Sequence, residues 1–291
     1  MAIDPFLYLS LGVGFLAGRL SRYHGPWVGR TTVLTIGLLV FLLGTTLGFA
    51  PVGALLAAVP LGIVFVVLIL GITIAVDRVV SRRLGTFSNH RSPPAKDGRS
   101  PYRLPLALLA SVLAGIAVGH AWTLATGTYL TYTLYLLLAL IGYDLNVIFP
   151  SPRTVVAPVC SAVIGAAGAA VVVTLLFGLP GRVAFATAFG FGWYTLTGPL
   201  VVRAAGPALG LIAFVTNFLR EDLTMLSAPW AGPRVGGEGL VAMGGAASMD
   251  TTLYFVTRYG DPKAGAVSLS SGLLLTVLAS LLVPLFLGIP G

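Results

Sequence analysis

The sequence predicts an all-α fold, a polytopic transmembrane helical bundle of about eight to ten spans. Hydrophobic residues make up 57% of the 291 residues and charged residues only 9%, whereas soluble domains carry about 25% charged residues. Mean hydropathy is +0.97. Apolar runs of about 20 residues, the length of a helix that crosses a bilayer, recur along the whole chain.

Ten segments follow one another as candidate spans. The first six and the last are continuous apolar runs. The seventh to ninth are short or interrupted by glycine, proline and charge, so we expect broken or re-entrant helices in the C-terminal half. The candidate spans are residues 5–21, 31–50, 52–76, 104–125, 128–149, 154–178, 183–203, 207–230, 237–257 and 264–288.

The basic residues predict the orientation. The 17 lysines and arginines exceed the acidic residues by eight, and all but Arg182, Arg220 and Arg234 fall on one side if the N-terminus is outside. Loops rich in Lys and Arg stay in the cytoplasm and suit its anionic leaflet. We therefore expect a multi-pass protein of the inner (cytoplasmic) membrane with both termini extracytoplasmic. The partner of the positive charge is then the lipid bilayer and not nucleic acid.

A polar stretch divides the chain. Residues 77–103 predict a basic cytoplasmic linker between an N-terminal three-span unit, residues 1–76, and a C-terminal transport unit, residues 104–291. A weak repeat relates residues 33–48, VLTIGLLVFLLGTTLG, to residues 131–146, TYTLYLLLALIGYDLN. Consecutive units of three spans have opposite topologies, so the repeat favours the inverted repeats that are common in secondary transporters.

Several chemistries leave a sequence signature that this chain lacks. Cys160 is the only cysteine, so neither an intrachain disulfide nor a thiolate metal cluster is expected. The chain has no GxxxxGK[ST] phosphate loop, no HExxH motif and only three scattered histidines. We therefore expect no cofactor, no metal and no enzymatic activity.

Three carboxylates interrupt apolar stretches: Asp144, Glu221 and Asp250. A charged side chain at the bilayer centre costs about 2.5–3.5 kcal/mol on insertion scales, so such residues mark a path or pocket, here for a cation. Each has a structural alternative. Asp144 can lie at the membrane interface, Glu221 can lie in a solvated loop, and Asp250 can cap a helix that begins at Thr251.

Polar residues accompany these acids. Asn217 and Glu221 are four residues apart and share one helix face. Arg220 can act as a fixed counter-ion or hold an anionic group with two hydrogen bonds. Ser248 and Thr251 flank the third acid after two glycines, a pattern typical of an unwound helix that faces a ligand.

The string GFGWYTLTGP, residues 190–199, interrupts another apolar segment with glycines and a proline. Trp193 and Tyr194 within it offer aromatic faces to a cation. The alternative is a pair of aromatic side chains at the membrane interface. The flanking glycines favour the first interpretation.

Three motifs carry a resemblance to a known family. GFGWYTLTG (190–198), NFLRE (217–221) and GGAASMDTTL (244–253) resemble, in order and spacing, the LysO lysine exporter family of bacterial and archaeal inner-membrane proteins. LLVFLLGTTLG (38–48) and IGYDLN (141–146) are similar to earlier spans of that family.

The resemblance implies export of L-lysine and its analogue thialysine by a proton-driven antiporter, with Glu221 and Asp250 as the two important acids. It also implies a fold like that of cation:proton antiporters, with inverted repeats and crossed, broken helices. Asp222 departs from the pattern as an additional acid. The expected partners are L-lysine or a similar cationic amino acid, protons or Na⁺, the bilayer, and a second copy of the chain in a homodimer.

One mechanism fits these expectations. Burial favours the protonated form of a carboxyl group and a nearby cation favours the ionised form, so lysine and protons can compete for Glu221 and Asp250. A sodium/proton or other cation antiporter needs the same acids. An intramembrane aspartyl protease is a remote alternative, because Asp144 follows a tyrosine but Asp250 lacks the GxGD motif. A structural protein would tolerate neutralisation of all three acids.

Overall fold

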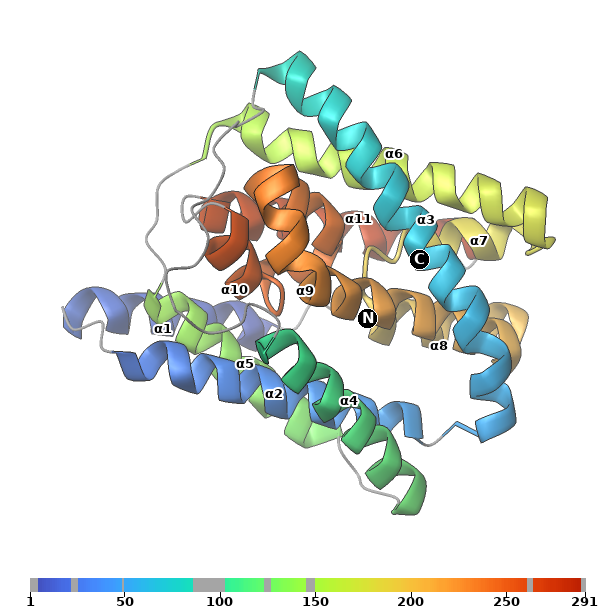
Figure 1. Ribbon diagram of the computed structural model, residues 1–291, viewed down its shortest axis with the longest axis horizontal. Helices are drawn as coiled ribbons and strands as arrows, with labels where there is room; N and C mark the ends of the chain where they lie inside the picture. Colours follow the sequence, from blue (N-terminus) through green and yellow to red (C-terminus); the bar gives the residue numbers. More distant parts are fainter. Residues whose placement is uncertain are drawn as a thin grey trace. The chain divides into compact units, whose positions relative to one another are not determined.

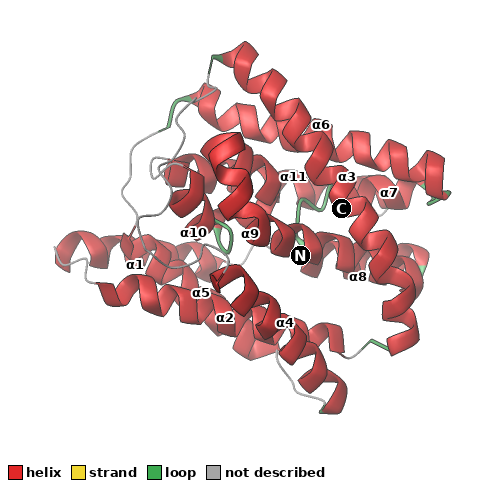
Figure 2. Cartoon of the chain, viewed as in Figure 1, coloured by secondary structure: helices red, strands yellow, loops and turns green. Residues whose placement is uncertain are grey.

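The computed structural model describes residues 5–21, 26–48, 50–85, 103–122, 127–144, 150–260 and 264–288, and these parts of the chain are helical with short turns (Figures 1 and 2). The chain divides into two compact units. Each unit is made of two separate stretches of sequence: Met1–Pro51 with Gly98–Val147, and Val52–Asp97 with Ile148–Gly291. The predicted all-helical class is confirmed in the described residues.

The described residues of the first unit form four helices. Helix α1 packs against α5, and α2 packs against both α4 and α5. A Cβ atom at Gly115 of α4 would overlap the Phe41 carbonyl of α2, and one at Gly14 of α1 would overlap the Ala139 carbonyl of α5. Small residues therefore bring these helices into backbone contact, as in many membrane helix pairs. The four helices are α1 (Pro5–Ser21), α2 (Pro26–Gly48), α4 (Arg103–Ala121) and α5 (Gly127–Asp144).

The second unit contains the remaining elements. The long helix α9 packs against α3, α6 and α8, and α11 packs against α6, α7 and the 3₁₀ turn η1. The bounds are α3 (Val52–Leu84), α6 (Pro152–Phe177), α7 (Gly181–Ala188), α8 (Tyr194–Ala205), α9 (Pro207–Gly244), η1 (Gly245–Met249), α10 (Leu253–Phe255), the π-helical turn η2 (Val256–Gly260) and α11 (Ala264–Leu287).

Four of the described helices are long and apolar enough to cross a membrane: Trp27–Thr46, Val52–Leu84, Pro152–Phe177 and Ala264–Leu287. Shorter apolar helices cover Leu106–Ala121 and Gly127–Leu140. These helices support a polytopic membrane protein. The number of eight to ten spans stays a prediction.

The expected breaks in the C-terminal half are present. Residues 183–203, predicted as one interrupted segment, form α7 and α8 with a break between them. Residues 207–230 and 237–257, predicted as two segments, are organised differently. Helix α9 runs to Gly244 with a kink at Gly236, whose φ of 73° is non-helical, and the chain then unwinds.

The predicted division into residues 1–76, 77–103 and 104–291 rests on the polar linker. Helix α3 continues through Leu84, so residues 77–84 of that linker are helical. Residues 86–102 lie outside the described residues. The three-part division stays a prediction, while the two compact units follow contacts in space.

Candidate functional site

Two helix breaks meet in the second unit. Residues 189–193 separate α7 from α8, and residues 245–252 follow α9. Phe191 and Gly192 have φ angles of 50° and 95°, and Gly245 has a φ of 66°. The Ala246 amide donates to the Phe191 carbonyl at 2.8 Å, so the two breaks touch through their backbones. A side chain at Gly245 would collide with that carbonyl, which explains the glycine.

Asn217, on α9, holds the first break. Its carboxamide oxygen accepts from the Gly192 amide at 2.8 Å, and its nitrogen donates to the carbonyls of Thr187 at 2.9 Å and Ala213 at 3.0 Å. A broken helix leaves backbone groups unpaired, and inside a membrane these groups need internal partners. Asn217 is expected from the sequence to face a ligand, but both ends of its carboxamide bind backbone and position the break.

Arg220 holds the second break. Its side chain is 0% exposed. Nε donates to the Met243 carbonyl at 2.9 Å and Nη2 to the Ala242 carbonyl at 3.0 Å. These carbonyls end α9, where the helix dipole favours a cation. The guanidinium carbon also lies 5.7 Å from the ring centroid of Phe191 in the first break.

Arg220 was predicted as a counter-ion or as a binding group for an anion. Two of its nitrogens are engaged by main-chain carbonyls. Nη1 is buried and has no hydrogen-bond partner in the described parts of the chain. Among the described residues, Arg220 forms no ion pair with Glu221 or Asp250. Its Nη1 is therefore a buried hydrogen-bond donor without an acceptor.

Glu221 and Asp250 come together although one lies on α9 and the other in the second break. Glu221 is 5% exposed, and the two carboxyl groups are close enough to interact electrostatically. The Thr251 hydroxyl donates to Asp250 Oδ1 at 3.2 Å. Glu221 Oε1 is buried without a partner among the described residues.

The structural alternatives for these two acids are wrong. Glu221 lies within α9 and is buried, not in a solvated loop. The helix after the second break begins at Leu253 with Thr252 at the cap position, so Asp250 does not cap a helix that begins at Thr251. Instead Asp250 Oδ1 accepts from the Thr251 amide at 2.6 Å.

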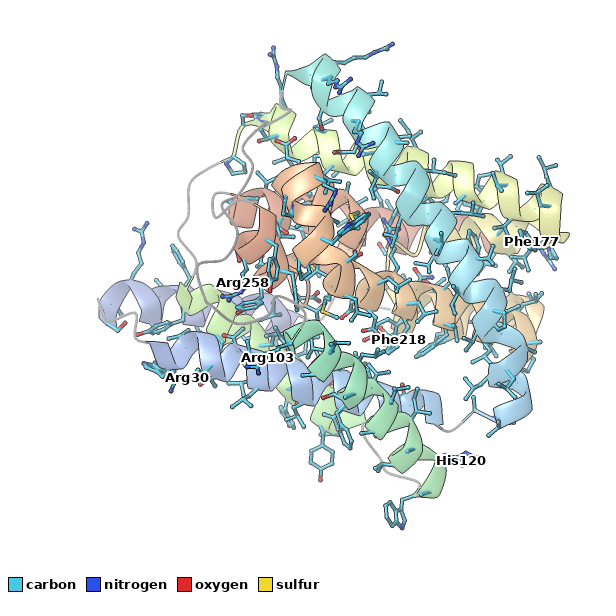
Figure 3. All side chains as sticks on the ribbon, viewed as in Figure 1. Arg30, Arg103, His120, Phe177, Phe218 and Arg258 are labelled. Atoms are coloured by element: carbon cyan, nitrogen blue, oxygen red, sulfur yellow. The ribbon has the colours of Figure 1, made fainter. Side chains whose placement is uncertain are left out.

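Tyr194 is the first residue of α8 and directly follows the first break. It interacts electrostatically with Glu221, Asp250 and Asp222. Its ring packs edge-on against Phe218, at 5.7 Å between centroids. Phe218 lies on α9 and is labelled in Figure 3. That Tyr194 offers its aromatic face to a cation stays a prediction.

Trp193 and Ser248 have other surroundings. Trp193 packs against the apolar core of the second unit. Ser248 is buried and donates to the carbonyls of Gly245 at 2.7 Å and Ser268 at 3.2 Å, and the Ser268 hydroxyl donates back to the Ser248 carbonyl at 2.6 Å. Ser248 thus ties the second break to α11.

Asp144 is the last residue of α5, in the first unit. Its side chain lies outside the described residues. Its predicted part in a cation site stays a prediction.

Two buried acids were not chosen as site residues from the sequence. Asp222 is 9% exposed and interacts electrostatically with Glu221. Asp77 is 2% exposed on α3, although the sequence places it at the start of a solvated linker. The signal for Asp77 is its spacing, because Thr73, Asp77 and Ser81 recur every four residues and share one helix face.

The family model described as "Lysine exporter LysO" matches residues 108–287. The chain is similar to "Lysine exporter LysO" of Escherichia coli (strain K12), with 29% identity over an alignment 300 residues long. The alignment covers 96% of this chain and 97% of that protein.

A Haemophilus influenzae protein named "Putative lysine exporter" is 30% identical over 101 residues, 35% of this chain and 51% of that protein. No solved structure matches the chain.

Proposed function

The chain belongs to the family of the lysine exporter LysO, and we propose that it exports L-lysine, and analogues such as thialysine, from the cytoplasm in exchange for protons. Its apolar helices make it a membrane protein. The relatives are named as exporters, and export is a transport function rather than catalysis. The substrate and the coupling ion are argued from the site.

One observation carries the proposal. Glu221 on α9 and Asp250 in the second break are close enough to interact electrostatically, and the Thr251 hydroxyl donates to Asp250. Lysine has two ammonium groups, and two carboxylates match two cations. Glu221 Oε1, which has no partner in the described residues, is an acceptor ready for one of these ammonium groups.

Exchange follows from competition for the same oxygens. Two carboxylates that are both ionised and close together repel each other, and a bound proton removes this repulsion when no other cation is present. A lysine that enters stabilises the ionised forms and displaces the protons. When lysine leaves on the other side, protons return and the cycle can repeat.

The carboxylate of lysine needs a donor. Arg220 Nη1 is the unpartnered donor of a buried guanidinium whose other nitrogens are fixed by the Ala242 and Met243 carbonyls. A donor held in this way loses little side-chain entropy on binding. Arg220 thereby serves both the second break and the substrate.

The transport cycle requires access from both sides. The site lies where α7–α8 and α9–α10 unwind, and movement of this crossing against its neighbours would expose it alternately to each side. We place the protein in the inner membrane with extracytoplasmic termini and inverted repeats. Oligomerisation as a homodimer is compatible with this arrangement.

The test is radiolabelled lysine counterflow in proteoliposomes, with arginine, ornithine and Na⁺ as competitors. Wild-type protein is expected to exchange lysine and to couple its efflux to a pH gradient. Asp250→Asn removes one carboxylate at constant size and should reduce coupled efflux to the level of empty vesicles. Asp97→Asn, in the predicted linker, is the matched control and should transport normally.

Wild-type efflux from Asp250→Asn, in protein that is inserted normally, would remove Asp250 from the mechanism. Inside-out vesicles with a pH-sensitive dye distinguish lysine/proton exchange from the alternative, sodium/proton exchange. Alkalinisation or acidification driven by Na⁺ and not by lysine would identify a sodium/proton antiporter that uses the same acids.

A further inference from the structure

Asp77 lies where α3 packs against α6, away from the two breaks. Its carboxylate is 2% exposed. Oδ1 accepts from the Ser161 hydroxyl of α6 at 3.1 Å and from the Ser81 hydroxyl of α3 at 3.3 Å. Arg78 acts on it electrostatically but is exposed, and the described contacts include no hydrogen bond between them. Both hydrogen bonds that Oδ1 accepts therefore come from uncharged hydroxyl groups.

Thr73 supplies a second, independent sign of a ligand. It lies one turn before Asp77 on the same face of α3 and is 0% exposed. Thr73 packs closely against Gly165 of α6, where an added Cβ atom would overlap the Thr73 hydroxyl, and Gly165 lies one turn after Ser161. Thr73 Oγ1 has no hydrogen-bond partner among the described residues. A buried hydroxyl without a hydrogen-bond partner lowers the stability of the folded state by about 1–3 kcal/mol. The Thr73 hydroxyl at the α3–α6 contact is therefore available to bind a ligand.

The opposite side of Asp77 faces α9. A Cβ atom at Gly239 would stand 3.2 Å from Asp77 Oδ2, so this helix contributes backbone and no side chain at that point. Gly239 belongs to the short stretch of α9 after the kink at Gly236. The same stretch ends at the carbonyls that Arg220 holds.

We propose that Asp77, Ser81, Ser161 and Thr73 form a sodium site between α3 and α6. Hard cations take oxygen ligands, and this set is made only of carboxylate and hydroxyl oxygens. One carboxylate balances one positive charge, which selects a monovalent ion over Mg²⁺ or Ca²⁺, whose sites commonly gather several carboxylates. A proton on Asp77 would satisfy a single oxygen and leave Thr73 without a partner.

A cation at this position links three helices. It joins α3 to α6 directly and lies against the part of α9 that leads into the second break. Occupancy would therefore stabilise the unit as a whole and the geometry of the crossing. This inference does not depend on the transported substrate.

The experiment measures thermal unfolding of the purified full chain in detergent at fixed pH and ionic strength, with Na⁺, K⁺ or N-methyl-D-glucamine as the cation. A ligand that binds only the folded state raises the melting temperature with concentration. Na⁺ should raise it in a saturable way and N-methyl-D-glucamine should not. Asp77→Asn should abolish the Na⁺ response.

Ser161→Ala keeps the charge and removes one ligand, so it should move the half-maximal Na⁺ concentration upward by about tenfold or more. Ser280→Ala, a hydroxyl on α11 that bonds its own helix, is the matched control and should respond as wild type. Asp250→Asn should also keep the response, which separates this site from the substrate site.

Any of three results overturns the sodium site: no Na⁺ response in the wild type, a response that survives Asp77→Asn, or an unchanged half-maximal concentration in Ser161→Ala. Loss of the response in Asp250→Asn would assign the ion to the crossing instead. Stabilisation by acid alone, without any effect of Na⁺, would assign a proton to Asp77 and equally reject the sodium site.

Discussion

The α2–α4 pair of the first unit and the meeting breaks of the second unit both bring two backbones into contact, by opposite means. In the pair, Gly115 lies directly against the Phe41 carbonyl, and both helices continue unbroken. At the breaks, the Ala246 amide bonds to the Phe191 carbonyl, and neither helix continues.

The difference shows where buried polar residues are needed. A regular helix has already paired its backbone groups, so close contact requires only the absence of a side chain. A broken helix exposes N–H and C=O groups, which lack water inside a membrane. Asn217 and Arg220 satisfy those groups, and the same stretch of α9 carries Glu221. One stretch of α9 therefore both stabilises the two breaks and supplies an acid of the candidate site.

Among the variants that test this comparison, Arg220→Met is expected to cause the largest loss of stability. The change leaves the Ala242 and Met243 carbonyls without their donors, and each buried unsatisfied group costs about 1–3 kcal/mol, so we expect a loss of about 2–6 kcal/mol in stability. Thermal unfolding in detergent measures it. Arg220→Lys keeps a cation and should lose less. A melting temperature equal to that of wild type would mean that the second break does not need this residue.

A smaller effect is expected for Asn217→Leu, which removes the acceptor of the Gly192 amide and the donor to the Thr187 carbonyl. The loss should be about 1–3 kcal/mol, the cost of one unpaired Gly192 amide, because the Thr187 carbonyl still accepts from the Gly190 amide. The neighbouring Thr216 is buried and its hydroxyl has no partner in the described residues, so Thr216→Val is the matched control and should be neutral or stabilising. Equal losses in the two variants would contradict a specific role for the amide.

Gly115→Ala tests the first unit. Its methyl group would overlap the Phe41 carbonyl, and overpacking typically costs about 1–3 kcal/mol. Gly12, on α1, has no atom near its missing Cβ, so Gly12→Ala should cause no loss. If Gly115→Ala were as stable as Gly12→Ala, the α2–α4 contact would not depend on glycine.

Much of the architecture was predictable because the bilayer restricts it. Long apolar runs predict helices, and the glycine-rich strings at residues 190–199 and 244–253 predict the breaks, since no other residue adopts φ angles such as that of Gly245 so readily. The pairing of Glu221 with Asp250 was suggested by the family motifs, and the structure brings their carboxyl groups within electrostatic range. The roles of Asn217 and Arg220 were predicted differently, because their partners are backbone atoms that no motif shows.

The sequence by itself determined a helical membrane protein, its interrupted C-terminal half and the burial of Glu221, since hydropathy and glycine act locally. Only the tertiary structure decided which hydrogen-bond partner each buried polar side chain has. Asn217 reaches back to Gly192 and Thr187, Arg220 reaches forward to Met243, and Asp77 meets Ser161 across two helices. Those pairings exist because a break or a buried charge must find its partner in three dimensions, wherever along the chain that partner lies.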